Sequence, residues 1–161
     1  LLLAENVGRN RDMELAVCVE IEKPLEDVWK AITDFKNCSD YIESIVKLEI
    51  IDEPKDTLIG FKWKETRVMF GKEAIETMWI TDSVENEYYE TRAESHGSIY
   101  ISRLSIERLE HHTKLTMSFK AEPQKLFAKM FSFCLGFMMK GSMKKALLKD
   151  LNDIKSHLES Y

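Results

Sequence analysis

The chain has 161 residues, the length of one ordinary domain. Hydrophobic residues make up 44% of it and charged residues 32%, a composition that excludes an intrinsically disordered chain. The formal net charge of −5 argues against a nucleic-acid-binding protein, because the protein as a whole does not attract polyanions.

Cysteine and histidine spacing argues against disulfide and metal sites. Cys18, Cys38 and Cys134 are far apart and form no C-x-x-C pair, which is typical of reduced thiols in a cytosolic protein. The histidines lack metal-ligand spacing and the scattered glycines form no phosphate-binding loop, so we expect neither a metal nor a cofactor. Residues 1–12 contain no signal-like segment and are interpreted as an extension or a cloning remnant, which leaves one cytoplasmic domain over 13–160.

The first third of the chain predicts a strand and two short helices. From residue 13, "MELAVCVEI" alternates, with Leu15, Val17, Val19 and Ile21 on one face of a half-buried strand. Pro24 then begins a helix, because proline suits a first helical turn and acidic residues follow it. Its apolar stripe consists of Leu25, Val28, Trp29 and Ile32. A capped turn or second short helix follows near Asn37 or Ser39.

The rest of the chain predicts six more strands and one long helix. The strands are expected at 44–52, 58–69, 72–81, 88–95, 99–109 and 114–122, and the helix from Pro123 to about residue 160. Consecutive hairpins indicate a twisted antiparallel sheet, and the long helix is the only large element left to cover its apolar face.

Charged residues fall at inward positions of the hairpin formed by 58–69 and 72–81. If Met69 pairs with Lys72, then Glu65 lies opposite Glu76 and Trp63 lies opposite Met78, with Arg67 beside the two glutamates. Two directly opposed carboxylates repel each other unless Arg67 or a shared proton relieves them. These three charges are therefore predicted to form one local cluster on the inner face.

The following strands place hydroxyl groups on the same inner face. Pairing Ser95 with Tyr100 places aromatic, aliphatic, methionine and hydroxyl side chains together on this face. They are Tyr89, Thr91, Ala93, Ser102, Leu104, Ile106, Leu115, Met117 and Phe119. Buried hydroxyls need a protein partner, water or a ligand. Apolar walls with a few convergent polar groups predict a small-molecule cavity.

The long helix changes character along its length. Its second half is amphipathic, with a stripe of Leu147, Leu148, Leu151, Ile154 and Leu158, whereas residues 126–143 are apolar nearly all round. The uncharged run at 130–139 is too short to span a bilayer. This half is interpreted as core packing, as a soft cavity wall that includes Phe131 and Met138, or as a face that docks on a membrane or partner.

The segment "IEKPLEDVWKAITDFKNCSDYI", with a strand running into a proline-started helix that bears Val-Trp, resembles the opening of the START-like, polyketide cyclase/dehydrase (SRPBCC, helix-grip) superfamily. "GFKWKETRVMFGKEAIE" and "AESHGSIYISRLSIE" are similar to its central strands, and "MMKGSMKKALLKDLNDIK" to its terminal helix. The resemblance implies an α+β helix-grip fold, in which a seven-stranded antiparallel sheet wraps around a long C-terminal helix and encloses a hydrophobic cavity. It supplies no catalytic motif, since the scaffold hosts lipid carriers, receptors and cyclases alike.

Three functions follow from this reading. The first is non-catalytic binding of a hydrophobic or amphipathic small molecule, such as a lipid, an isoprenoid or an aromatic compound, with Arg67 holding an acidic or carbonyl head group. The predicted binding residues are Trp63, Glu65, Arg67, Glu76, Met78, Tyr89, Tyr100, Ser102, Met117, Phe119, Phe131 and Met138.

The second function is a cyclase or dehydratase in which Glu65, Glu76 and Arg67 do proton chemistry, although a purely structural cluster is the favoured alternative. The third is membrane or partner docking through the Phe/Met-rich half of the last helix, where the flanking lysines either contact a membrane or keep the helix soluble. The sequence identifies neither the ligand nor the oligomeric state.

Overall fold

The computed structural model describes residues 13–124 and 126–161, and within these ranges the side chains of all residues except 13, 123 and 126–139. The elements are β1 (Met13–Ile21), α1 (Leu25–Ile32), the 3-10 helix η1 (Cys38–Asp40), β2 (Ile45–Asp52), β3 (Lys62–Met69), β4 (Lys72–Val84), β5 (Tyr88–Ser95), β6 (Ser98–Arg108), β7 (Thr113–Pro123) and α2 (Leu126–Glu159). The predicted order of one strand, two short helices, six strands and one long helix is confirmed.

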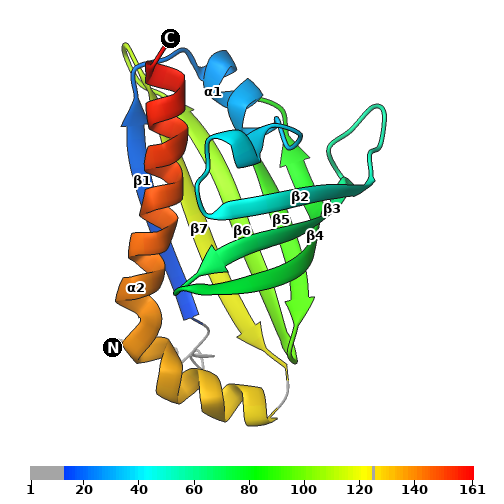
Figure 1. The fold of residues 1–161 in the computed structure, drawn as a ribbon. Coiled ribbons are helices and arrows are strands. Elements are labelled where there is room, and N and C mark those ends of the chain that lie inside the picture. The colour runs from blue at the N-terminus through cyan, green and yellow to red at the C-terminus, as the bar shows by residue number, and fades with distance from the viewer. Residues whose placement is uncertain (1–12, 125) are drawn as a thin grey trace, which may run out of the picture.

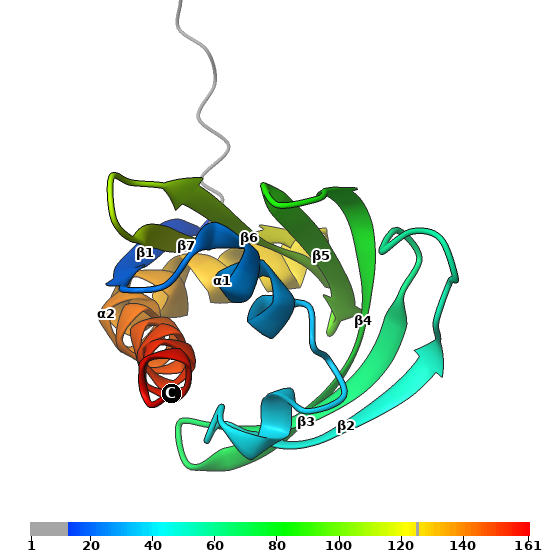
Figure 2. The same ribbon diagram turned by 90° about the horizontal axis from the view of Figure 1, so that it is seen from above.

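The seven strands form one antiparallel sheet in the order β1-β7-β6-β5-β4-β3-β2. Strands β2 to β7 follow one another as hairpins, and β1 joins the sheet beside β7. The sheet curves around α1, and α2 lies along β1 (Figures 1 and 2). This is the predicted α+β helix-grip fold.

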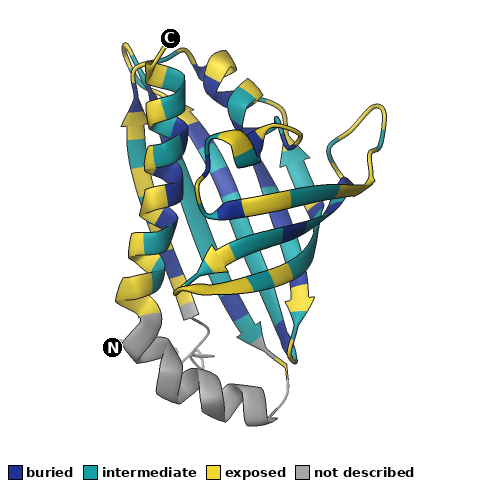
Figure 3. Ribbon diagram, viewed as in Figure 1, coloured by how far each residue is buried: buried dark blue, intermediate teal, exposed yellow. Residues whose placement is uncertain are grey.

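Alternation and helical spacing decide which residues are inside. In β1, Leu15 and Ile21 are buried whereas Glu14, Ala16 and Cys18 are exposed, as a half-buried strand requires. All four residues of the predicted α1 stripe are buried. Among the described side chains of α2, the buried positions face the sheet (Figure 3) and are Leu147, Asp150, Leu151 and Ile154. Leu148, which the sequence places on the stripe, is instead 38% exposed.

Two tight hairpin turns set the register of the central strands. In both the β3–β4 turn (Phe70, Gly71) and the β5–β6 turn (His96, Gly97), the two central residues have positive φ, as type I′ turns need. The β3–β4 pairing agrees with the prediction, including Glu65 opposite Glu76.

The predicted β5–β6 register was wrong by two residues. Ser95 pairs with Ser98, and Tyr100 pairs with Ala93, because His96 accepts the left-handed conformation and allows a two-residue turn. A shift of two residues keeps every side chain on its predicted face. Pro123 also differs from expectation, because it ends β7 and α2 begins at Leu126.

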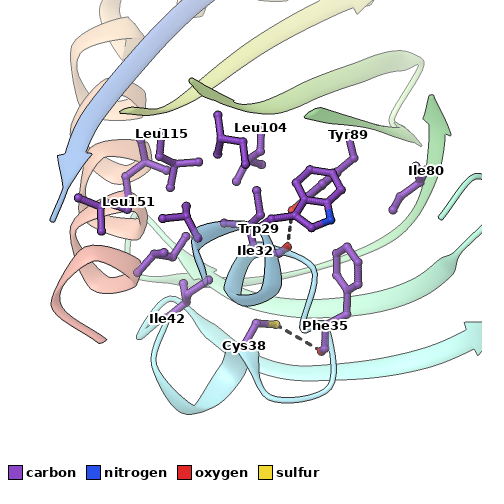
Figure 4. Close-up of a cluster of buried hydrophobic side chains, with 14 of the residues drawn as sticks. Trp29, Ile32, Phe35, Cys38, Ile42, Ile80, Tyr89, Leu104, Leu115 and Leu151 are labelled. Carbon is purple, nitrogen blue, oxygen red and sulfur yellow. Dashed lines mark hydrogen bonds between the residues drawn. The ribbon is translucent and has the colours of Figure 1, made fainter. Parts of the chain in front are cut away.

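An aromatic cluster fills one end of the inner sheet face, next to α1. The ring of Phe35 stacks on Phe61 with centroids 4.6 Å apart and lies 5.0 Å from the ring of Trp63. Tyr89 packs edge-on against Phe35, and its hydroxyl donates a 3.1 Å hydrogen bond to the carbonyl of Ile32 at the end of α1 (Figure 4). Burial of this kind is the main source of stability in the fold.

Candidate functional site

A cavity of about 330 Å³ lies between the inner sheet face, the α1–η1 segment and the second half of α2. Its size is at the lower end of the range for small-molecule pockets, roughly 300–1,000 Å³. Apolar side chains provide most of its wall, among them Ile32, Phe35, Ile42, Leu104, Leu147 and Leu151. Hydroxyl groups from Thr91, Tyr100 and Ser102 interrupt that wall.

Ten of the twelve residues predicted to contact a ligand line this cavity. They are Trp63, Glu65, Arg67, Glu76, Met78, Tyr89, Tyr100, Ser102, Met117 and Phe119. Their convergence follows from the alternation of β3 to β7, which sends every second side chain to the same concave face. The other two, Phe131 and Met138, have side chains outside the described part of the structure. Contact of any of the twelve with a ligand stays a prediction.

Arg67 forms a buried polar network that joins β3 to α2. Its Nε donates to Oε1 of Glu65 at 2.6 Å, and its Nη1 donates to Oδ2 of Asp150 on α2 at 2.9 Å. Trp63 Nε1 donates to the other Glu65 oxygen at 3.2 Å, and Ser44 Oγ donates to the other Asp150 oxygen at 2.7 Å. Together, Ser44, Trp63, Glu65, Arg67 and Asp150 are called here the Arg67 network.

The second carboxylate of this network differs from the sequence prediction. Arg67 takes Asp150 as its second partner, not Glu76, although Glu76 lies directly opposite Glu65 in the sheet. Within the described part of the chain, Glu76 makes no hydrogen bond or ion pair, and its half-buried side chain faces the cavity. Asp150 was missed, although it stands between Leu147 and Leu151 on an apolar stripe, where a carboxylate calls for a buried partner.

Burial and charge fix the protonation of two groups on the cavity wall. Desolvation alone would lower the pKa of Arg67, but the charges of Glu65 and Asp150 outweigh it and raise the pKa, so the guanidinium stays charged. Burial, with a smaller contribution from the charge of Glu65, raises the pKa of the Cys38 thiol to about 12. Cys38 is therefore a neutral thiol at physiological pH and a poor nucleophile.

Other kinds of site receive no support from the described residues. No group of three or more His, Cys, Asp or Glu side chains among them is arranged to hold a metal ion. His112 lies 2.9 Å from Glu20, and the ring of His157 stacks on Tyr41. None of the described helical segments is both long and apolar enough to cross a bilayer.

Comparison with models of known protein families identifies the family of this chain. Residues 13–159 match the family described as polyketide cyclase/dehydrase and lipid transport. The chain belongs to this family, and the match begins at the first residue of β1 and ends at the last residue of α2. A comparison with curated protein sequences gives no match.

Solved structures with the same fold are distant in sequence. The Zhui aromatase/cyclase from Streptomyces sp. R1128 is 15% identical, with a TM-score of 0.74, and the alignment covers 92% of this chain and 94% of that one. A START superfamily protein from Mycobacterium smegmatis is 16% identical, with a TM-score of 0.70 and coverage of 90% and 98%. A protein from Thermus thermophilus is 13% identical, with a TM-score of 0.75 and coverage of 91% and 97%. At these identities the likeness establishes the fold alone.

Proposed function

We propose that this protein binds a hydrophobic or amphipathic small molecule in the cavity between the sheet and α2, without transforming it. The observation that supports this most is the mixed wall of the cavity. A space of about 330 Å³ with a largely apolar wall is costly when it serves only packing, because that wall is left without the contacts of a packed core. Membership in a family described by cyclase/dehydrase activity and lipid transport agrees with a hydrophobic ligand.

The arrangement of the carboxylates favours binding over catalysis. In an acid–base mechanism, Glu65 and Glu76 would both have to exchange protons with the same bound substrate. Glu65 instead accepts hydrogen bonds from Trp63 and Arg67 and is only 5% exposed, so its oxygens serve the Arg67 network. Glu76 alone faces the cavity without a partner among the described residues. Of the two glutamates, only Glu76 therefore stays a candidate for proton chemistry under the cyclase or dehydratase hypothesis.

The docking hypothesis concerns the Phe/Met-rich half of α2. The side chains of 126–139 lie outside the described part of the structure, so this hypothesis stays a prediction from the sequence. It is compatible with ligand binding, because a carrier that collects a hydrophobic molecule from a membrane needs both a cavity and an interfacial surface.

Binding can be tested by blocking the cavity from one strand. Ala74 and Ile75 are neighbours on β4; Ala74 lines the cavity, whereas Ile75 is 61% exposed on the outer face. Ala74→Trp should fill part of the cavity and Ile75→Trp should leave it unchanged. The neutral dye N-phenyl-1-naphthylamine, which fluoresces in apolar surroundings, reports on access to the cavity.

We expect the wild type and Ile75→Trp to bind the dye equally, and Ala74→Trp to bind it at least about tenfold more weakly. Circular dichroism and thermal unfolding establish that both variants are folded. Native mass spectrometry after mild purification shows in parallel whether a small molecule accompanies the wild type. A folded wild-type protein that takes up neither dye nor cellular ligand would overturn the proposal, and so would equal binding by all three proteins.

A further inference from the structure

The charges on the cavity wall restrict the ligand beyond its being hydrophobic. Among the described residues that line the cavity, three are carboxylates and one is a cation, namely Glu65, Glu76, Asp150 and Arg67. Because charges interact more strongly beside an apolar wall than in open solvent, this imbalance gives the described part of the cavity wall a net negative charge that favours a cation.

Arg67 is not free to neutralise the negative charge of an acidic ligand. Its guanidinium already forms ion pairs with two carboxylates at 2.6 and 2.9 Å, and each of these carboxylates also receives a hydrogen bond from a neutral donor. A ligand carboxylate that approached Arg67 would have to compete with both partners. The prediction that Arg67 holds the head group is therefore not favoured for an acidic ligand.

Among the described carboxylates of the cavity wall, Glu76 is the one that remains available to a ligand. It faces the cavity from β4, directly across the hairpin from Glu65, so the field of a second carboxylate acts on it. No described residue donates a hydrogen bond or forms an ion pair with it. A positively charged donor placed beside Glu76 would relieve this like-charge opposition and gain a charge-assisted hydrogen bond.

We propose that the cavity selects amphipathic ligands with a cationic amine at the polar end, bound by Glu76, over neutral alcohols and over carboxylates. This rests on the proposed binding function and specifies its ligand class. The apolar part of such a ligand lies along the wall formed by Met78, Met117 and Phe119.

Three probes with the same chain and different head groups test this selectivity, namely decylamine, decanol and decanoate. Each is titrated at pH 7, below its critical micelle concentration, by displacement of N-phenyl-1-naphthylamine. We expect decylamine to bind about tenfold more tightly than decanol, and decanoate to bind most weakly. Glu76→Gln should lower the affinity for decylamine to that for decanol.

Glu73→Gln is the matched control, because Glu73 lies on the same strand but is exposed on the outer face. Glu76→Gln should fold, since it removes one of two opposed charges. Equal binding of decylamine and decanol, a preference for decanoate, or an equal loss of decylamine binding in both variants would overturn the amine proposal while leaving cavity binding intact. Failure of all three probes and of the dye to bind would instead overturn the binding function itself.

Discussion

The two ends of the inner sheet face come from the same strands but differ in packing. Four residues define the packed end, with exposures of 5%, 1%, 8% and 0%. They are Phe61, which directly precedes β3, and Ile80, Ile106 and Leu115. Further along the same four strands, the side chains that define the cavity end are only half-buried, and they are Arg67, Glu76, Tyr100 and Phe119. Strand alternation is equal at both ends, so alternation does not cause the difference.

The difference lies in what covers each end. At the packed end, α1 and the chain that follows it contribute Trp29 and Phe35, whose rings contact Tyr89 and Phe61. At the cavity end, the Arg67 network joins β3 to α2 through charged groups. We infer that stability is concentrated at one end of the sheet, which leaves space at the other for a ligand.

The largest effect is expected from removing the cation of the Arg67 network. Arg67→Met leaves Glu65 and Asp150 as buried carboxylates without their shared partner, so the free energy of unfolding should fall by about 3–5 kcal/mol. Urea unfolding measures this loss. Adding Glu65→Gln and Asp150→Asn to Arg67→Met should recover a large part of it, because the unpaired charges are then gone.

Arg103→Met provides the control for this comparison. Arg103 pairs with Glu90 at 2.9 Å, but the two side chains are 42% and 25% exposed, so losing the pair should cost only about 0–1 kcal/mol. Similar losses for Arg67→Met and Arg103→Met would show that the Arg67 network does not hold the cavity end to α2.

The second prediction compares the two ends directly on β7. Leu115→Ala removes a side chain with 0% exposure and should cost about 2–5 kcal/mol, because it opens a new void in close packing. Met117→Ala, two residues further on the same face, should cost about 1–2 kcal/mol, because it only widens a space that already exists. Thermal and urea unfolding of both variants give the two values, and a loss at Met117 that equals the loss at Leu115 would contradict the contrast.

The smallest effect at neutral pH concerns Cys38, a thiol on the cavity wall. Its pKa rises from 9.0 to about 12 in the folded protein, so the unfolded chain ionises at lower pH than the folded one. The free energy of unfolding should therefore be unaffected by this group below about pH 9 and decrease between about pH 9 and 12. Replacement by alanine or serine should flatten that part of the pH profile.

Alkylation gives an independent measure of the same thiol. In a Cys134→Ser background, iodoacetamide at pH 8 should modify the exposed Cys18 and leave Cys38 unmodified until the protein unfolds. Rapid modification of Cys38 in the folded protein would mean that the cavity wall around it is open to water.

Local patterns were sufficient to predict the order of elements and the β3–β4 register. In a hairpin with a two-residue turn, the pairing of Met69 with Lys72 determines every later pair, so Glu65 could be placed opposite Glu76 from the sequence. The same arithmetic failed for β5–β6, because His96 in the turn is a weaker signal than Gly97 and the choice of turn residues decides the register.

The Arg67–Asp150 pair lay beyond such reasoning. The two residues are 83 positions apart, and their contact depends on how far the sheet curves and where α2 lies against it. Neither the curvature of the sheet nor the position of α2 can be predicted from the two-residue period of a strand or the 3.6-residue period of a helix. That Glu76 has no partner among the described residues follows from the same long-range contact, because Asp150 takes the position at Arg67 that Glu76 was expected to occupy.

Methyl NMR of the methionines tests the central claim, ligand binding at the cavity end, most directly. Met78 and Met117 both line the cavity, and their signals can be assigned with Met78→Leu and Met117→Leu. Titration with decylamine is predicted to shift both signals in a saturable way, and Ala74→Trp is predicted to abolish the shifts. Unchanged Met78 and Met117 signals at saturating decylamine, or equal shifts in Ala74→Trp, would contradict the account.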